Sequence, residues 1–203
     1  MENEKFNFAM VDDEDVVQPK QLWALEAFTI VSRALGKAKT PQALVEQLCK
    51  AVTNMPPYMK AWIGSVNDDS DKTIEVVGSF GALTASGYLR DIYISWDASR
   101  PEGQGPVGQS VRSGETTIIN DIGSDKNFIL WRDRAYKHGI RSALSIPIHG
   151  NSDKVNYVFV VYASEPQGFD DYHIRVFECL AQETVARLAE FKPLPVAARY
   201  PET

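Results

Sequence analysis

Three glycines give this sequence its clearest match to a chemical motif. Gly103, Gly105 and Gly108 follow the spacing G-x-G-x-x-G, with which a loop after a strand holds the pyrophosphate of a dinucleotide. In that motif the glycines follow directly on an apolar strand, but here residues 98–102 intervene and Pro106 stands where the turn should tighten. The same residues fit better as the start of a short helix, with Gly105 as its cap and Pro106 at its first position. We therefore expect no dinucleotide site.

The other side chains with reactive chemistry are few and scattered. Cys49 and Cys179 lie far apart, each inside an apolar helical pattern, which is typical of buried reduced thiols and fits neither a disulfide framework nor a zinc site. Asp121 and Asp125 share one loop, where two acids form a turn more often than an acid–base pair. The motifs G-x-S-x-G and H-E-x-x-H are absent. The sequence therefore predicts that the chain is not an enzyme and binds no metal.

The chain has three histidines. His138 stands beside Lys137 at the end of a predicted helix, where the helix dipole alone favours a partly positive side chain, so we expect it to point outward. His149 falls in a predicted hairpin and His173 in the first turn of a predicted helix. We expect both to be in contact with solvent.

The composition is that of one globular domain. The 203 residues are 44% hydrophobic and 24% charged, which is enough for one sizeable core. The net charge is −6 and the Lys and Arg residues are scattered, so no basic stripe is available for nucleic acid. No apolar run approaches the roughly 20 residues of a membrane span. We expect a cytoplasmic protein with a flexible acidic lead at 1–18, one domain at 19–191 and an extended tail at 192–203.

Apolar periodicity and capping residues place the helices and strands along this domain. Thr40 and Pro41, for example, are a typical N-cap and first helical residue. The expected long helices cover residues 21–36, 40–54 and 169–191. The expected strands cover residues 61–66, 73–80, 91–96, 116–120, 142–148 and 155–163.

The last two expected strands have unlike faces. Along residues 142–148, bulky Leu144 and Ile146 alternate with Ala143 and Ser145, and residues 155–163 alternate in a similar way. Neither strand has a polar face, so both sides of the sheet must be covered. We expect the terminal helices on the bulky side and residues 103–139 on the other side, where the smaller side chains leave room for a cavity.

The order of segments between residues 103 and 147 carries a family resemblance. GQGPVGQSVRSGE precedes a short strand, NDIGSD and FILWRDRA follow it, and GIRSALSIPI begins the next strand. Continued by YASEPQGFDDYHIRVFECLAQE, this order resembles the GAF domain family of small-molecule sensing modules over residues 23–190, most of all the modules that precede GGDEF or EAL domains of cyclic-dinucleotide signalling. The resemblance implies an α+β fold, with an antiparallel sheet of about six strands, terminal helices on one face and a ligand cavity on the other.

The resemblance also implies where a ligand would lie. In GAF domains the cavity is roofed by the helix that here carries Trp131 and walled by the loop that here carries Asp121. Together with the strand faces, this predicts a cavity lined by Trp62, Trp96, Asp121, Phe128, Trp131, Ala143, Ser145, Val160 and Tyr162. We expect a compact, weakly charged or aromatic ligand, whose identity the sequence does not specify, and a signal passed to an output domain or a partner kinase.

The residues leave alternatives open. His138 as an axial ligand of haem would make the domain a gas or redox sensor. Aromatic side chains that fill the cavity would leave an interaction module without a ligand. The family branches that reduce methionine sulfoxide or attach a bilin need cysteine at the pocket, and neither Cys49 nor Cys179 falls there.

The two terminal helices carry more apolar surface than packing on one sheet requires. In residues 22–35 the apolar side chains spread around most of the helix circumference. In residues 174–191 they recur at spacings of three and four, like a heptad seam. We expect these helices to form the interface of a homodimer.

Overall fold

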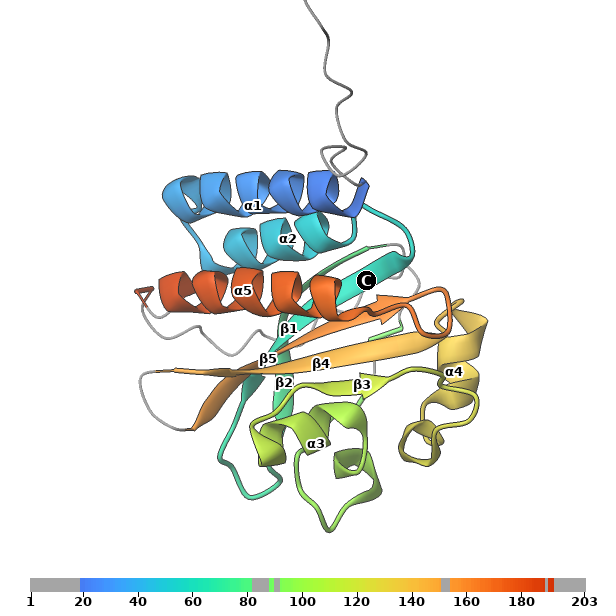
Figure 1. The fold of residues 1–203 in the computed structure, drawn as a ribbon. Helices are drawn as coiled ribbons and strands as arrows, with labels where there is room; N and C mark the ends of the chain where they lie inside the picture. The colour runs from blue at the N-terminus through green and yellow to red at the C-terminus, as the bar shows by residue number, and fades with distance from the viewer. Residues whose placement is uncertain (1–18, 82–87, 90–91, 151–153, 189, 192–203) are drawn as a thin grey trace, which may run out of the picture.

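The computed structural model describes residues 19–81, 88–89, 92–150, 154–188 and 190–191, so the predicted acidic lead and the extended tail lie outside the described residues. The chain forms one five-stranded antiparallel sheet with helices on both faces (Figure 1). In the order β2-β1-β5-β4-β3, the strands comprise β1 Tyr58–Val66, β2 Ile74–Gly81, β3 Thr117–Ile119, β4 Ser142–His149 and β5 Val155–Ala163.

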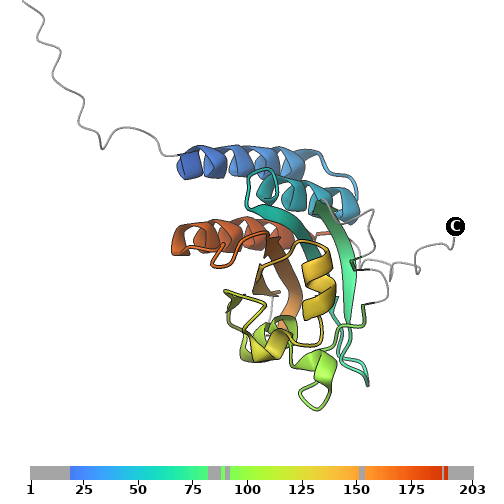
Figure 2. The ribbon, with the colours of Figure 1, turned by 90° about the vertical axis from the view of Figure 1, so that its right-hand side faces the viewer.

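The three long helices lie together on one side of the sheet, which we call the helix face (Figures 1 and 2). They are α1 Pro19–Lys37, α2 Pro41–Val52 and α5 Asp171–Leu188. The other side, the cavity face, is covered by α3 Pro106–Ser113, α4 Arg132–Lys137 and the short 3-10 turns η2 Pro101–Gly103 and η3 Lys126–Phe128. Among the described residues, no helix combines the length and the apolarity that crossing a membrane requires.

Local capping explains where these helices begin and end. The backbone N–H of Ala43 donates to Thr40 Oγ1 at 3.2 Å, and Pro41 occupies the first turn of α2, as predicted. Helix α3 begins after Gly105 as its cap and ends at Gly114, whose φ of 71° is the left-handed conformation that glycine adopts without strain. The glycine-rich segment is therefore a helix start, as the sequence predicted.

The predicted division of the strand faces is confirmed. On the helix face, Leu144 and Ile146 of β4 pack with Phe159 of β5 in the same cluster as α1, α2 and α5. On the cavity face, Ala143 and Val160 belong to a second cluster with α3 and α4. Because successive side chains of a strand point to opposite faces, β4 and β5 form a wall between two separate cores.

The predicted strand at residues 91–96 is not formed, so the sheet has five strands instead of about six. Within its described part, residues 92–96, one isolated bridge joins Ser95 to Thr73. The Ser95 hydroxyl donates to the Asp71 carbonyl at 2.9 Å and accepts from the backbone N–H of Asp97 at 3.0 Å. These side-chain bonds compete with a strand ladder and turn the chain away after one bridge.

Two predictions about single side chains were wrong. Cys179 is exposed, whereas Cys49 is buried as expected. The apolar stripe of α5 includes Phe177 and Leu180, which leaves Cys179 off the buried face. His173 is buried, with Nδ1 2.8 Å from Asp170 Oδ1, because its ring packs against the aromatic side chains of the helix face.

The terminal helices differ in what they leave exposed. The heptad-like seam of α5 is used inside the fold, because Phe177, Ala181 and Leu188 are all buried in the helix-face cluster. Helix α1 instead leaves Leu22 and Leu25 exposed, at 55% and 63%. Of these two helices, α1 is therefore the one that leaves large apolar side chains exposed.

Candidate functional site

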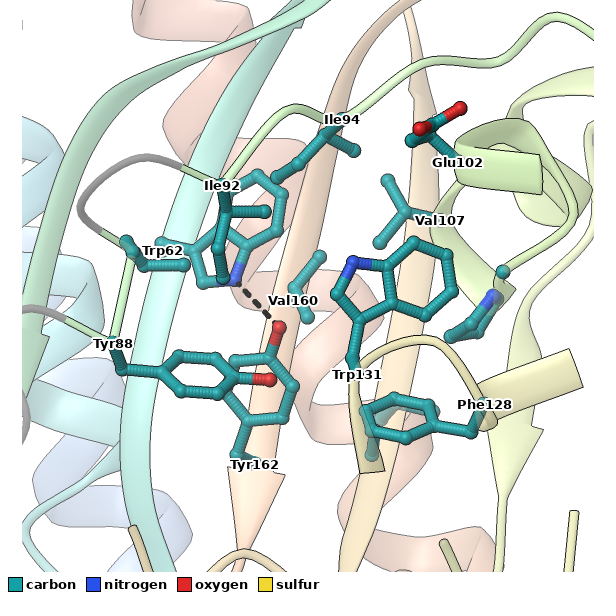
Figure 3. Close-up of a pocket in the computed structure, with 15 residues that line it drawn as sticks. Trp62, Tyr88, Ile92, Ile94, Glu102, Val107, Phe128, Trp131, Val160 and Tyr162 are labelled. Atoms are coloured by element: carbon teal, nitrogen blue, oxygen red, sulfur yellow. Dashed lines mark hydrogen bonds between the residues drawn. The ribbon is translucent and has the colours of Figure 1, made fainter. Parts of the chain in front are cut away.

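A cavity lies on the cavity face, between the sheet and the segments around α3 and η3 (Figure 3). Its volume is about 30 Å³, measured as the space open to the centre of a water molecule, where one bound water needs roughly 10–15 Å³. The cavity is lined by Trp62, Tyr88, Leu89, Ile92, Ile94, Glu102, Gly105, Pro106, Val107, Phe128, Trp131, Ala143, Leu144, Val160 and Tyr162. By this measure the cavity has room for about two or three water molecules.

The strands β1 and β5 supply the floor of the cavity and its main polar group. Trp62 and Tyr162 are diagonal neighbours on the same face of these adjacent strands, and Trp62 Nε1–H donates to the Tyr162 hydroxyl oxygen at 3.3 Å (Figure 3). The Tyr88 ring meets the Tyr162 ring edge to face, with 5.4 Å between centroids. Burial raises the pKa of Tyr162 to about 12, and hydrogen bonds from Trp62 and Tyr88 offset part of that increase. The phenol is therefore neutral at physiological pH.

The roof of the cavity is Trp131, which precedes α4 instead of lying within a helix as predicted. Phe128 ends η3, and the Trp131 backbone N–H donates to the Phe128 carbonyl at 3.1 Å. The Trp131 carbonyl accepts from the Ala135 N–H at 2.8 Å, as the N-cap of α4. Arg132 fixes this turn from the next position, because its guanidinium donates to the backbone carbonyls of Ile122 and Asp125 at 2.9 and 2.8 Å. The indole is thus held by backbone turns on both sides.

Close approach of the backbone explains the glycine spacing that first suggested a dinucleotide site. A methyl group on Gly105 would overlap the Trp131 indole, so glycine lets the ring lie on the start of α3. A methyl group on Gly108 would lie 2.9 Å from the Ser95 carbonyl oxygen and closer still to that of Gly103. These glycines serve packing under the roof of the cavity.

Six of the nine residues predicted to line the cavity do so. They are Trp62, Phe128, Trp131, Ala143, Val160 and Tyr162. That a ligand binds to them stays a prediction.

The structure places the other three predicted residues elsewhere. Ser145 has the predicted orientation, but α3 fills the space above it, and its hydroxyl lies 2.8 Å from that of Ser110. Asp121 forms a turn, with Oδ1 accepting from the backbone N–H of Gly123 at 2.8 Å. Trp96 lies beyond the bridge at Ser95 and donates from Nε1 to the Asn67 carbonyl at 2.8 Å.

Several lining residues were missed in the sequence. Ile92 and Ile94 have the same alternation as Trp96, so the pattern that selected Trp96 could have selected them. Tyr88 carried no such signal, because residues 88–89 form a turn outside any strand or helix. Glu102 lies in η2, just before the glycines that were interpreted only as a helix start.

The charges around the cavity are sparse. Glu102 is the single charged side chain among the fifteen described residues of the lining, and its carboxylate has no hydrogen bond or ion pair with any residue that the structure describes. His138 is not in the lining, and its ring meets Tyr88 edge to face at 5.4 Å between centroids. No group of three metal-binding side chains occurs among the described residues. A haem held by His138 is therefore not supported by the geometry.

A buried lysine stands beside this site. Lys60 of β1 pairs with Tyr162 of β5, and 1% of its surface is exposed. Within the described ranges its ammonium group forms no hydrogen bond or ion pair, and it does not line the cavity. Burial lowers the pKa of Lys60 to about 8. The fold therefore holds this lysine at a cost in stability.

Solved structures of an enzyme and of GAF domains share this fold. The free methionine-R-sulfoxide reductase of Neisseria meningitidis, in complex with its substrate, is 16% identical, with a TM-score of 0.67 over 85% of this chain and 92% of that chain. The GAF domain of a phosphoenolpyruvate-protein phosphotransferase from Coxiella burnetii is 14% identical, with a TM-score of 0.66 over 82% and 94%. The GAF domain of the Acinetobacter phosphotransferase is 16% identical, with a TM-score of 0.61 over 82% and 93%. At such identities the likeness concerns the fold alone.

The Neisseria structure corrects the prediction that the chain is not an enzyme. We based that prediction on missing catalytic motifs and on a resemblance to sensory modules. The same fold carries a catalytic activity in the reductase, so neither argument excludes catalysis.

Sequence comparison identifies the family. No curated protein sequence matches the chain. A sequence model of the GAF domain, however, matches residues 38–188, which is well over half of the chain. The sheet, the helix face and the cavity face described above lie within this range or border it. The chain therefore belongs to the GAF domain family.

Proposed function

We propose that this GAF domain is a sensory module that binds a compact small molecule in the cavity beneath Trp131. The observation that carries the proposal is the open space of about 30 Å³ on the cavity face. Protein cores are close-packed, and voids larger than a water molecule are few. Here the void borders a half-buried indole at the edge of the fold, which gives a small molecule a route of entry.

The lining suggests how such a molecule would be held. The Trp131 ring offers a stacking surface, and the Tyr162 hydroxyl offers a polar contact at the floor. The described lining contains no Lys, Arg or His, so a buried phosphate would lack the cationic partners that it requires. We therefore do not propose a cyclic dinucleotide as the ligand, although a GGDEF or EAL domain is a possible output by resemblance.

A thermal-shift screen of metabolites tests ligand binding, and Trp131→Ala is the decisive variant. A true ligand at a hundredfold excess over its Kd stabilises the folded state by about 2.7 kcal/mol. We expect this shift in the wild type, a much smaller one in Trp131→Ala, and an unchanged one in Trp96→Ala. Trp96 is the matched control because it is a half-buried tryptophan outside the lining. If Trp131→Ala leaves the stabilisation by a compound unchanged, that compound binds elsewhere in the protein. A screen without stabilising compounds would favour an interaction module.

We further propose that α1 mediates a homodimer through Leu22 and Leu25. Both side chains are more than half exposed, and a free apolar patch of this kind is a common mark of an interface. Leu25→Glu is expected to convert a dimer into a monomer in sedimentation velocity at tens of micromolar. Leu130→Glu is the matched control, because Leu130 is also exposed, at 52%, but lies on the cavity-face segment. A monomeric wild type, or a dimer that only Leu130→Glu dissociates, would contradict the proposal.

A further inference from the structure

We infer that the cavity takes a compact organic cation, of the alkylated ammonium class, with its charged group against the aromatic rings. This inference rests on the proposed function, that the cavity is a ligand site. It adds the chemical class of the ligand, which the sequence left open between aromatic and weakly charged molecules.

The lining is an aromatic box. Five rings from separate parts of the chain converge on one small space, namely Trp62, Tyr88, Phe128, Trp131 and Tyr162 (Figure 3). The Phe128 and Trp131 centroids are 5.9 Å apart, and those of Tyr88 and Tyr162 are 5.4 Å apart. A ring face carries negative charge density and attracts a cation within about 6 Å of its centroid. A space bordered by several rings therefore suits the positively charged end of a small molecule, and the alkyl groups on its nitrogen would need the rings to move apart.

The charge in the lining has the matching sign. Glu102 lies at the edge of the box, above Trp131 in Figure 3, and no described residue neutralises its carboxylate. No described lining residue is a cation, so nothing in the wall itself would repel an ammonium group. The Tyr162 hydroxyl is neutral, and because its oxygen accepts from Trp62 and Tyr88, its O–H can donate to a polar substituent of the ligand.

Two cationic side chains lie close to the box without lining it. The Arg134 guanidinium lies 5.9 Å from the Tyr88 ring centroid, which shows that this ring already attracts a positive group. Lys60 pairs with Tyr162 in the sheet. At long range both side chains would favour an anion over a cation. Whether the aromatic lining outweighs them is measured by comparing a charged ligand with a neutral ligand of the same shape.

The test compares choline with 3,3-dimethylbutan-1-ol, which has the same shape and no charge. Binding to the full chain is measured by ligand-observed NMR titration. We expect choline to bind roughly tenfold more tightly than the neutral alcohol, the size of a desolvated cation–π contribution. Glu102→Gln should weaken the binding of choline and leave the binding of the alcohol unchanged. Glu46→Gln, an exposed acid on α2, should change neither.

The aromatic contribution is tested at Trp131. Trp131→Phe keeps a ring and should retain part of the preference for choline, whereas Trp131→Ala should lose it, with circular dichroism as the check of folding. Equal binding of alcohol and choline overturns the organic-cation inference while the cavity stands as a ligand site. If choline does not bind but the metabolite screen yields other Trp131-dependent hits, the organic-cation inference fails and the proposed ligand site stands. If neither probe binds and the screen is empty, the proposed function fails with it.

Discussion

Replacing Lys60 with methionine is expected to stabilise the protein by about 3 kcal/mol at pH 7. Lys60 is 1% exposed and has no ion-pair partner among the described residues. The folded state therefore buries an unpaired ammonium group, whereas in the unfolded chain water solvates it. Its pKa falls from 10.5 to about 8 on folding, and each pKa unit corresponds to about 1.4 kcal/mol. Methionine has a similar length and fills the same space without the charge.

The pH dependence distinguishes this cause from better packing. Between pH 8 and 10.5 the unfolded state binds more protons at Lys60 than the folded state, so the lysine becomes less destabilising as the pH rises. The advantage of Lys60→Met should therefore shrink by about 2 kcal/mol between pH 7 and pH 9.5. Burial raises the pKa of the Cys49 thiol, which lowers the stability of both proteins as the pH rises toward 9.5. The charge of Lys60 opposes this increase less than burial causes it, so most of the effect cancels in the difference.

Urea denaturation of both proteins at pH 7 and pH 9.5 measures the difference. Lys50→Met is the control, because Lys50 is exposed on α2 and should give no pH-dependent gap. A Lys60→Met protein that is less stable than wild type at pH 7, or a gap that does not change with pH, would show that the ammonium group has a partner in solution.

Gly108→Ala is expected to destabilise the protein by about 3 kcal/mol, at the upper end of the usual cost of overpacking. The new methyl group would meet backbone on two sides, the carbonyls of Gly103 and Ser95. Neither can rotate away as a side chain would, so α3 itself must move. Because Pro106 and Val107 of the same helix line the cavity, any ligand-induced stabilisation should fall as well.

A second glycine provides the matched control. At Gly36, in the last turn of α1, an added methyl group meets nothing within 4 Å. Gly36→Ala should be neutral or stabilising by up to about 1 kcal/mol, because alanine is the better helix former. Both variants are compared with wild type by urea denaturation. Equal stabilities of the two variants would mean that α3 is less closely packed on η2 than described.

Local chemistry made much of the fold predictable. The caps at Thr40 and Gly105, and the alternation in β4 and β5, depend on residues close in sequence, and the structure follows them. The same alternation placed Ala143, Val160 and Tyr162 on the cavity face. These three need only a strand and a parity to be positioned.

The errors share a different origin, which is competition from hydrogen bonds that the pattern does not encode. Ser145 has the right parity, but the cavity does not extend over it because Ser110 of α3 takes its hydroxyl. Asp121 satisfies its own turn, and Ser95 ends a strand after one bridge. Cys179 is a different case, since its place depends on the angle at which α5 meets the sheet. The contacts of Ser145 and of Ser95 with Asp71 join segments far apart in sequence, so periodicity alone does not contain them.

The wall formed by β4 and β5 also has a mechanical consequence. Val160 touches the cavity, while its neighbours in the chain, Phe159 and Val161, are embedded among the helices. One peptide unit joins each pair, and a peptide unit is stiff. A molecule that displaced Val160 would therefore also displace Phe159 and Val161, which pack in the helix-face cluster. The two sides of the sheet are thus connected through directly bonded residues. Under the proposed function, occupancy on one side of the sheet would therefore strain the packing on the other side without a relay of intervening side chains.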